Sequence, residues 1–530
     1  MKSPRCCMSL NKDGHLKGIV ATIGLLVIWE IVGRLDLVAG GALPGFSEIL
    51  IRLWVDRADY PQHIMATLYG SGLGFVFGNL LGVGAGIIFA MSPVALRLWR
   101  GVNIAIFALP PIAIAPILTL TLSGMTPRVV LATLGVYFVT MTATVIGLSQ
   151  ADSRAIDVVR AYGGGNWAVM RLVQLRGAVP SILSGFRVAA PNAVLGAILA
   201  EFGGGGRWGL GAYLLGSLGR AEPDRLWGIG LLATLIAGLS YLVFALLSER
   251  FLGASRAVTM NTAIPDSQIG AQGPFARIAL LAGACALPFG LWWLFIRLLS
   301  VPDMIAKTPL GVVNYLFYAP SSANAQGRLW QAVAETLPIT FAGMAAGLAV
   351  AFVLAISTRL YPRILNALMP VALVTQTMPL VALTPLLVLL LGRGTSLTLW
   401  VTISVTFFPA FVTLAQGIAL VPKGARDVPR AYGASAWQEM RMVTIPASLP
   451  YLFAATRLTV PRALLGVMIA QWLATGRGLG NLLNQSRGYM DYGMIWTVAV
   501  LSVILSVVFY QLVVFAERWV LSRLGMQTAE

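Results

Sequence analysis

The sequence has very few charged residues for its length. Of 530 residues only 11% are Asp, Glu, Lys or Arg, whereas 58% are hydrophobic, and the mean hydropathy is +0.81. A soluble globule of this size needs far more charge to cover its surface. The composition therefore excludes a soluble protein and predicts one that is embedded in a lipid bilayer.

Cysteine, histidine and lysine are also scarce. Three cysteines and two histidines, in no metal-ligand spacing, exclude a disulfide framework and predict no metal site. None of the five lysines completes the Gly-x-x-x-x-Gly-Lys-Ser/Thr loop that cradles phosphates, so we expect no ATPase site and no bound cofactor in this chain. The net charge of +17 is spread singly between apolar runs, which is typical of membrane topology and not of nucleic-acid binding.

Long apolar runs dominate the rest of the chain. About 20 apolar residues cross the roughly 30 Å hydrocarbon layer as a helix. The pattern predicts an all-α integral membrane fold with about 12 transmembrane helices, six in each half. The expected spans of the first half lie near 18–33, 65–91, 101–122, 129–148, 180–202 and 227–247. Those of the second half lie near 277–299, 333–356, 366–391, 397–418, 450–473 and 494–516.

Lys and Arg residues are distributed unevenly between the two sides of this layout. If the N-terminus is cytoplasmic, the cytoplasmic segments hold 21 of them and the opposite side holds 13. Positive residues are enriched on the cytoplasmic side of membrane proteins. We therefore expect the N- and C-termini to be cytoplasmic.

A seven-residue string occurs twice in the chain, 270 residues apart. Asp157-Val158-Val159-Arg160-Ala161-Tyr162-Gly163 returns as Asp427-Val428-Pro429-Arg430-Ala431-Tyr432-Gly433. The repeat predicts a tandem duplication with a first half at 1–252 and a second half at 275–530. The stretch 253–274 between them has the Ser, Asn, Pro, Gln and Gly content of a flexible cytoplasmic linker.

Each copy of the string opens a polar loop between apolar spans. Asp157 and Asp427 are expected to cap a short helix, with Pro429 in its first turn, and Gly163 and Gly433 to end it with a sharp break. Beyond the break, Trp, Met and Arg recur at i, i+3 and i+4, which predicts one face of a second short helix. These residues are Trp167, Met170 and Arg171 in one half and Trp437, Met440 and Arg441 in the other.

Two interpretations of this loop are open. Aromatic, Met and Arg side chains together are typical of a protein interface, whereas an amphipathic helix resting on lipid headgroups also uses Arg and Trp. A headgroup helix needs no glycine at one fixed place in both halves, so docking to a partner is favoured. The predicted docking residues are Asp157, Arg160, Tyr162, Gly163, Trp167 and Arg171, with Asp427, Arg430, Tyr432, Gly433, Trp437 and Arg441.

The loop resembles the signature loop of permease subunits of bacterial binding-protein-dependent ABC importers. That signature runs Glu-Ala-Ala, three residues, Gly, a later Leu-Pro step, a second Pro and Gly-x-Arg. The matching residues are Gly163 and Gly433, Leu175 and Ile445-Pro446, Pro180 and Pro450, and Gly185-x-Arg187. The chain departs from it at Asp157-Val158-Val159 and Asp427-Val428-Pro429, at Arg176, and in the second copy, where only Arg457 remains of the last motif.

A second motif narrows the resemblance. Gly209-Leu210-Gly211 and Gly478-Leu479-Gly480 follow the fifth span of each half, after Ala200-Glu201 and Ala470-Gln471, as in the nitrate, sulfonate and taurine permeases, a group that includes importers of pyrimidine-type precursors. The resemblance implies two fused type I permease halves in a bacterial inner membrane, with cytoplasmic coupling helices. It further implies two ABC ATPase subunits that use ATP, an extracytoplasmic solute-binding protein and a small-molecule substrate, with an anion among the candidates.

One cation is expected inside the bilayer. Arg462 lies roughly 18 Å along its span from Pro450, near the bilayer centre, and Asn192 is the matching position of the first half. An ionisable residue there is a candidate for the substrate path, although snorkelling or pairing with an acid also explains it. The main rival function is an ion-coupled secondary transporter of 12 transmembrane helices, which needs buried carboxylates that the middles of these spans almost lack.

Overall fold

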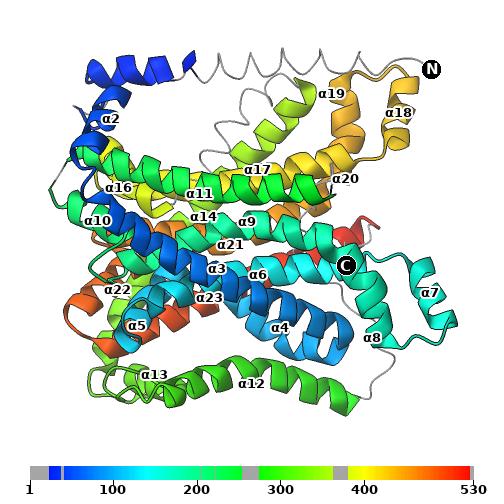
Figure 1. The fold of residues 1–530 in the computed structure, drawn as a ribbon, viewed down its shortest axis with the longest axis horizontal. Helices are drawn as coiled ribbons and strands as arrows, with labels where there is room; N and C mark the ends of the chain where they lie inside the picture. Colours follow the sequence, from blue (N-terminus) through cyan, green and yellow to red (C-terminus); the bar gives the residue numbers. More distant parts are fainter. Residues whose placement is uncertain are drawn as a thin grey trace.

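The computed structural model describes residues 23, 24, 26–37, 41–204, 206–220, 222–252, 274–361 and 380–525. All regular elements within these ranges are helices (Figure 1). In hydrocarbon no water is present to satisfy backbone amides and carbonyls, so apolar sequence folds as helices that satisfy these groups internally. The predicted all-α fold is confirmed.

The first half begins with a helical stretch at 26–34. The helices that follow are α2 (Phe46–Val55), α3 (Tyr60–Met91), α4 (Pro93–Ala108), α5 (Pro111–Thr121), α6 (Thr126–Ser149), α7 (Ser153–Ala161), α8 (Asn166–Val169), the π-helical turn η2 (Met170–Gln174), α9 (Leu175–Phe202), α10 (Leu210–Leu218) and α11 (Pro223–Leu252).

The second half repeats this order. Its helices are α12 (Pro274–Leu298), α13 (Pro309–Phe317), α14 (Ser322–Leu360), α16 (Leu380–Leu391), α17 (Thr395–Leu420), α18 (Lys423–Ala431), α19 (Ala436–Glu439), the π-helical turn η3 (Met440–Thr444), α20 (Ile445–Ala447), α21 (Leu449–Ala470), the π-helical turn η4 (Gln471–Thr475), α22 (Gly478–Gly488) and α23 (Tyr492–Arg523). Apart from Pro274, the expected linker at 253–274 lies outside the described residues.

Nine helices in the described ranges are long and apolar enough to cross a bilayer, or ten if α4 and α5 form one bent span. All nine fall on expected spans. The expected span at 101–122 is broken in two, because α4 and α5 meet at 98°. Leu109 and Pro110 are extended between them, and the proline ring of Pro111 prevents a continuous hydrogen-bond ladder. The expected spans at 18–33 and 366–391 lie partly outside the described residues.

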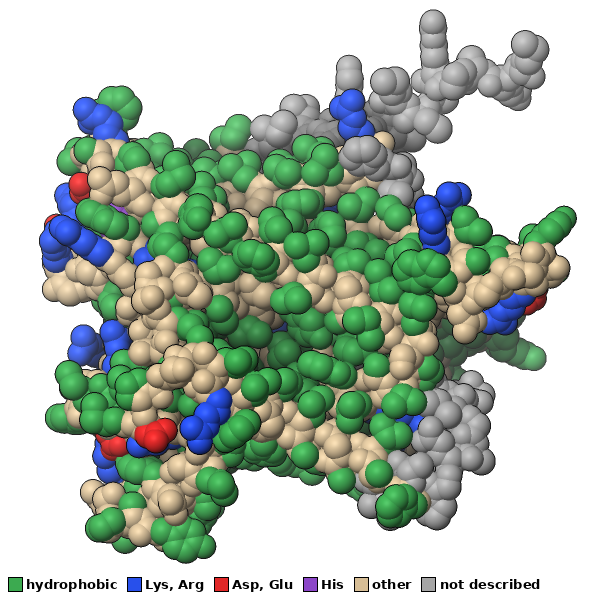
Figure 2. Space-filling view, turned by 60° about the horizontal axis from the view of Figure 1, so that its bottom comes forward, with side chains coloured by type: hydrophobic (Ala, Val, Ile, Leu, Met, Phe, Trp, Pro, Cys, Tyr) green, Lys and Arg blue, Asp and Glu red, His purple; other side chains and the backbone are tan. Residues whose placement is uncertain are grey.

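Charged side chains gather mainly toward the two ends of the molecule, and apolar side chains cover the middle of the face in view (Figure 2). The short helices α7, α8, α18 and α19 lie at one end, together with the end of α23, while α10, α22 and α13 lie at the other (Figure 1). This distribution is that of a protein whose middle lies in lipid and whose ends lie in water. We call the end with α7 and α18 the loop end, and the opposite one the outer end.

Glycines bring α3 against α6 and α14 against α17. A side-chain carbon at Gly78 would lie 2.5 Å from Cβ of Val136, and one at Gly343 would lie 2.6 Å from Cβ of Thr402. No real side chains approach so closely, so only glycine permits these contacts.

The two halves hold each other through corresponding helices. The short helix α5 of the first half packs against α21, α22 and α23, and α16 of the second half packs against α9, α10 and α11. In addition, α12 lies along α4 of the first half. Each half therefore supplies a short helix to the core of the other.

Candidate coupling loops and transport path

The repeated string forms the end of a short helix, not its beginning. Both α7 and α18 start four residues before the aspartates that were expected to cap them. The cap of α7 is Asp152, whose carboxylate accepts a 2.9 Å hydrogen bond from the amide of Arg154, and the corresponding residue before α18 is Pro422. The prediction that Asp157 and Asp427 are caps is therefore wrong, because the residues in front of them already form helical turns.

The break after each short helix is confirmed. Gly163 has φ +80° and Gly433 has φ +81°, a left-handed conformation that glycine adopts without a steric penalty. Pro429, expected in a first turn, lies instead near the end of α18. Its missing amide removes one hydrogen bond from the helix just before the break.

The residues beyond the break do not share one face as predicted. Trp167 is 60% exposed and Arg171 is exposed, but Met170 is only 1% exposed and packs between α6 and α9. In the second half Trp437 is likewise exposed and Met440 buried. The chain enters a π-helical turn at each methionine, and burial of the apolar side chain turns it inward, away from Trp and Arg.

Each loop carries a tyrosine whose side chain is almost completely exposed to solvent. Tyr162 is 89% exposed and Tyr432 is 90% exposed, and both loops project at the same end of the molecule (Figure 1). Exposed aromatic side chains in matched positions indicate surfaces for a partner. The other exposed residues among those predicted to dock are Asp157, Arg160, Gly163, Trp167 and Arg171, with Asp427, Arg430, Gly433, Trp437 and Arg441.

At the outer end, the Gly-Leu-Gly motif closes a buried hydrogen-bond network. The hydroxyl of Thr67 donates to the carboxylate of Glu201 at 2.8 Å and accepts from the amide of Leu210 at 3.0 Å. The amide of Gly211 donates to Glu201 at 2.9 Å. Gly209, with φ +140°, lies so close to Glu201 that a side chain there would collide with the carboxyl group.

The second half builds the same network with a glutamine in place of the acid, and the carboxylate of Glu335 accepts from the amide of Gly478 at 2.7 Å. Thr336 donates to Gln471 at 3.0 Å and accepts from the amide of Leu479 at 2.9 Å, while Gly480 donates to Gln471 at 3.2 Å. The sequence contained the signal, since Glu201 and Gln471 precede the same motif, but it did not reveal their threonine partners.

The acid of the first half has a buried cation beside it. A terminal nitrogen of Arg128 lies 3.8 Å from the Glu201 carboxylate, and Arg128 also donates to the carbonyl oxygen of Trp208. In the second half, contacts with the packing glycines place Thr398 at the position of Arg128. Arginine and glutamate in one half thus correspond to threonine and glutamine in the other.

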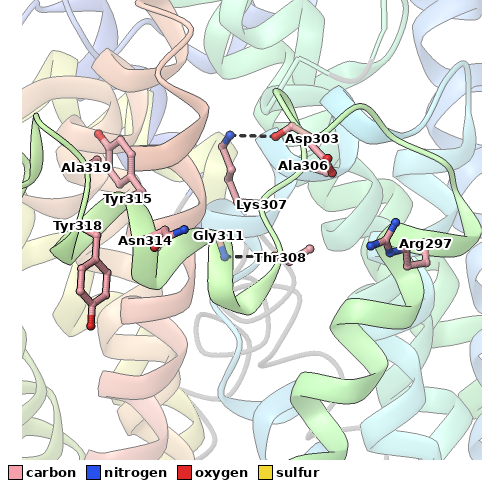
Figure 3. A pocket seen from close by; sticks show the side chains of 10 residues that line it. All are labelled: Arg297, Asp303, Ala306, Lys307, Thr308, Gly311, Asn314, Tyr315, Tyr318 and Ala319. Carbon is pink, nitrogen blue, oxygen red and sulfur yellow. Dashed lines mark hydrogen bonds between the residues drawn. The ribbon is translucent and has the colours of Figure 1, made fainter.

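A cavity of about 600 Å³ opens at the outer end beside α13 (Figure 3). Arg297 at the end of α12 and Lys307 before α13 bring positive charge to it, and the Lys307 ammonium donates to the carbonyl oxygen of Asp303 at 2.9 Å. Tyr315 on its wall donates to the carboxylate of Asp491 at 2.9 Å. No sequence pattern marks this cavity, because its residues are spread over two helices and a loop.

Asn192 and Arg462 occupy equivalent places, each directly after a proline within α9 or α21, and each is partly buried. Within the described ranges the Arg462 guanidinium makes no hydrogen bond or ion pair. Arg457, one and a half turns earlier, differs, because it pairs with Glu517 of α23 at 2.9 Å. Its counterpart Arg187 lies over the ring of Tyr241 at 4.4 Å.

Two matched helical bundles, with spans of membrane length and a pair of exposed loops at one end, define a duplicated integral membrane permease. The family model described as the binding-protein-dependent transport system inner membrane component matches residues 78–292 and 331–525. The chain belongs to this family, and the family occurs in it twice. This confirms the prediction of two fused ABC importer permease halves and disfavours the rival secondary transporter.

Known relatives align with about one half of this chain. The riboflavin transport system permease protein RibX of Chloroflexus aurantiacus is 29% identical over 43% of this chain and 83% of its own length. The putative aliphatic sulfonates transport permease protein SsuC of Bacillus subtilis is 24% identical over 45% and 87%, respectively. The taurine transport system permease protein TauC of Escherichia coli is 22% identical over 47% of this chain and 91% of its own length.

Proposed function

We propose that this chain is the transmembrane subunit of an ATP-driven importer and forms the path of a small anionic solute between its two halves. Membership of the permease family implies separate ATPase subunits and a solute-binding protein. The observation that carries the proposal is the matched pair of exposed loops at one end of a duplicated bundle. Each loop docks one ATPase subunit in the cytoplasm, where both termini also lie.

The docking residues are the exposed ones of the two loops. Tyr162 and Tyr432 form the tips, and the neighbouring Trp and Arg side chains supply the aromatic and cationic contacts that are enriched at interface centres. The chain itself binds no ATP, which the partner subunits hydrolyse. Force reaches the spans directly, because each loop continues through a π-helical turn into the long helix that follows, α9 or α20 and α21.

Co-purification tests the docking. The full chain is co-expressed with the ATPase subunit of its transport system, and Tyr162→Ala and Tyr432→Ala are compared with Tyr318→Ala, a tyrosine at the outer end that is 78% exposed. We expect the two loop variants to lose bound ATPase and ATP-dependent uptake, and the control to keep its bound ATPase. Uptake that continues without any nucleotide-hydrolysing subunit would overturn the proposal.

Arg462 supports an anionic substrate. A partly buried guanidinium near the middle of α21, without an ionic partner in the described ranges, has donors available for a carboxylate, sulfonate or nitrate. SsuC and TauC are named for the transport of aliphatic sulfonates and taurine, whereas another relative, ThiX of Halalkalibacterium halodurans, is named for the transport of formylaminopyrimidine. A pyrimidine-type precursor is therefore the second candidate.

Uptake into proteoliposomes that contain the complete transporter decides between these substrates. Taurine, an alkanesulfonate, nitrate and formylaminopyrimidine are supplied in turn to the wild type and to the variants Arg462→Ala and Asn192→Ala. We expect Arg462→Ala to raise the apparent KM for the transported anion at least tenfold, and Asn192→Ala to have a smaller effect. If KM and rate are unchanged in Arg462→Ala, this residue does not contact substrate.

A further inference from the structure

A buried glutamate links the two short helices of the second loop, α18 and α19. Glu439, 3% exposed, accepts a 2.6 Å hydrogen bond from a terminal nitrogen of Arg430 and a 3.0 Å bond from the hydroxyl of Thr444. Arg430 lies before the break at Gly433 and Glu439 after it, so the pair ties the two short helices together. Charge-assisted hydrogen bonds of this length are the stronger class.

A capping box holds the same turn, and the hydrogen bonds to Glu439 also shift its pKa. The hydroxyl of Ser435 accepts from the amide of Gln438 at 3.3 Å, and the Gln438 side chain accepts from the amide of Ser435 at 2.7 Å, which caps α19. Burial raises the pKa of the Glu439 carboxyl, but the bonds from Arg430 and Thr444 outweigh it, with a smaller contribution from Arg359, and hold the pKa below its usual range.

Among the described residues, the first loop has neither the arginine–glutamate pair nor the capping box. Counted from the two break glycines, Val169 stands in place of Glu439, Gly165 in place of Ser435 and Gln174 in place of Thr444. Val169 is buried like Glu439, so this position is packed in both loops but is charged only in the second. Arg160, the counterpart of Arg430, is exposed, and its guanidinium makes no hydrogen bond or ion pair within the part of the chain that the structure describes.

We propose that the two loops bind their ATPase subunits in different ways. Arg160 donates to a carboxylate on the subunit that docks on the first loop, whereas Arg430 is a positioning residue that shapes the second loop before docking. This inference rests on the proposed function, since it assumes that ATPase subunits are the partners.

The chemistry of arginine supports this division. A free guanidinium presents planar donors that match a carboxylate in two places, and its charge is not compensated within the first loop. In the second loop Glu439 neutralises the charge of Arg430 and takes up one of its donors.

Residue exchanges between the loops provide the test. The full chain in lipid nanodiscs carries a photo-crosslinker at position 158 or 428, in place of an exposed valine of the repeated string, and is titrated with the ATPase subunit that co-purifies with it. We expect Arg160→Ala to raise the half-saturation concentration at the first loop at least tenfold, and Arg430→Ala to change that at the second less than threefold. Val169→Glu, which places the second loop's acid beside Arg160, should weaken docking as Arg160→Ala does.

Amide hydrogen exchange of the chain without any partner is the second readout. In the wild type, residues 423–444 should exchange at least tenfold more slowly than residues 153–174. Glu439→Val should remove this difference, and Val169→Glu should slow the first loop. Equal exchange in both wild-type loops, or equal losses of docking in Arg160→Ala and Arg430→Ala, would overturn the inference. If no ATPase subunit crosslinks to either wild-type loop, the proposed function itself fails.

Discussion

The buried pair of Arg128 and Glu201 offers a sharp test, because the second half has threonine and glutamine at the same two positions. Glu201 is held by Thr67 and Gly211 in addition to Arg128. We consider Arg128→Met, which keeps much of the side-chain volume, Glu201→Gln, which copies the second half, and the double variant. The second half demonstrates that glutamine satisfies the threonine and the glycine amide without a cation.

The magnitudes follow from what each change leaves behind. Arg128→Met leaves a buried carboxyl group without its cation, and Glu201→Gln leaves a buried guanidinium without its anion. Removing one partner of such a pair costs on the order of 3–5 kcal/mol, whereas replacing both by neutral groups is often close to neutral. The double variant still loses the bond from Arg128 to the carbonyl oxygen of Trp208, which is worth about 1 kcal/mol.

The free energy of unfolding of the purified chain, measured by SDS titration in mixed micelles, is the assay. We expect each single variant to lose about 3–5 kcal/mol and the double variant to lose about 1 kcal/mol, so the effects are strongly non-additive. If the double variant loses the sum of the two single losses, the ion pair does not couple these residues and the reasoning is refuted.

Three further predictions concern packing, the second corner and the second loop. Gly78→Ala should destabilise the chain by about 1–3 kcal/mol because its methyl group collides with α6. Gly84→Ala on the same helix has open space and should not destabilise the chain. Equal unfolding midpoints of the two variants would contradict the packing role. Thr336→Val should cost about 1–3 kcal/mol in the same SDS titration, since it leaves the buried amide of Leu479 without an acceptor, and an unchanged midpoint would contradict the network. The folded pKa of the Glu439 carboxyl lies below its usual value of about 4.5, so its stabilisation is present above that pH and is lost as the pH falls through the folded pKa. The gap in thermal midpoint between wild type and Glu439→Gln should therefore narrow as the pH is lowered below about 4.5. A gap that stays constant over this range would show that Glu439 does not titrate with the loop.

The sequence predicted the membrane class, the duplication and nine helices in their correct places. These features come from the length of apolar runs and from a repeated string, and both can be read directly along the chain. The apolar run continues through the bend between α4 and α5, so the hydrophobic signal alone gives no break there. Only Pro110 and Pro111 marked the place, and prolines also occur inside straight spans.

The partners of the candidate sites were harder to predict. Thr67 and Glu201, or Arg457 and Glu517, come from helices far apart in the chain, and no local pattern joins them. No shared motif marks Glu439, because the two copies differ at this position. The informative signal is a difference between the copies, since an acid in one loop aligns with a valine in the other.

Such differences have a consequence for how this transporter evolves. When two identical subunits assemble, every substitution appears on both sides of the pore, so a valine that suits one partner must suit the other as well. Here both copies are translated together, and each molecule contains one of each. Covalent fusion therefore lets Val169 and Glu439, Arg128 and Thr398, or Asn192 and Arg462 specialise independently while their proportion stays fixed.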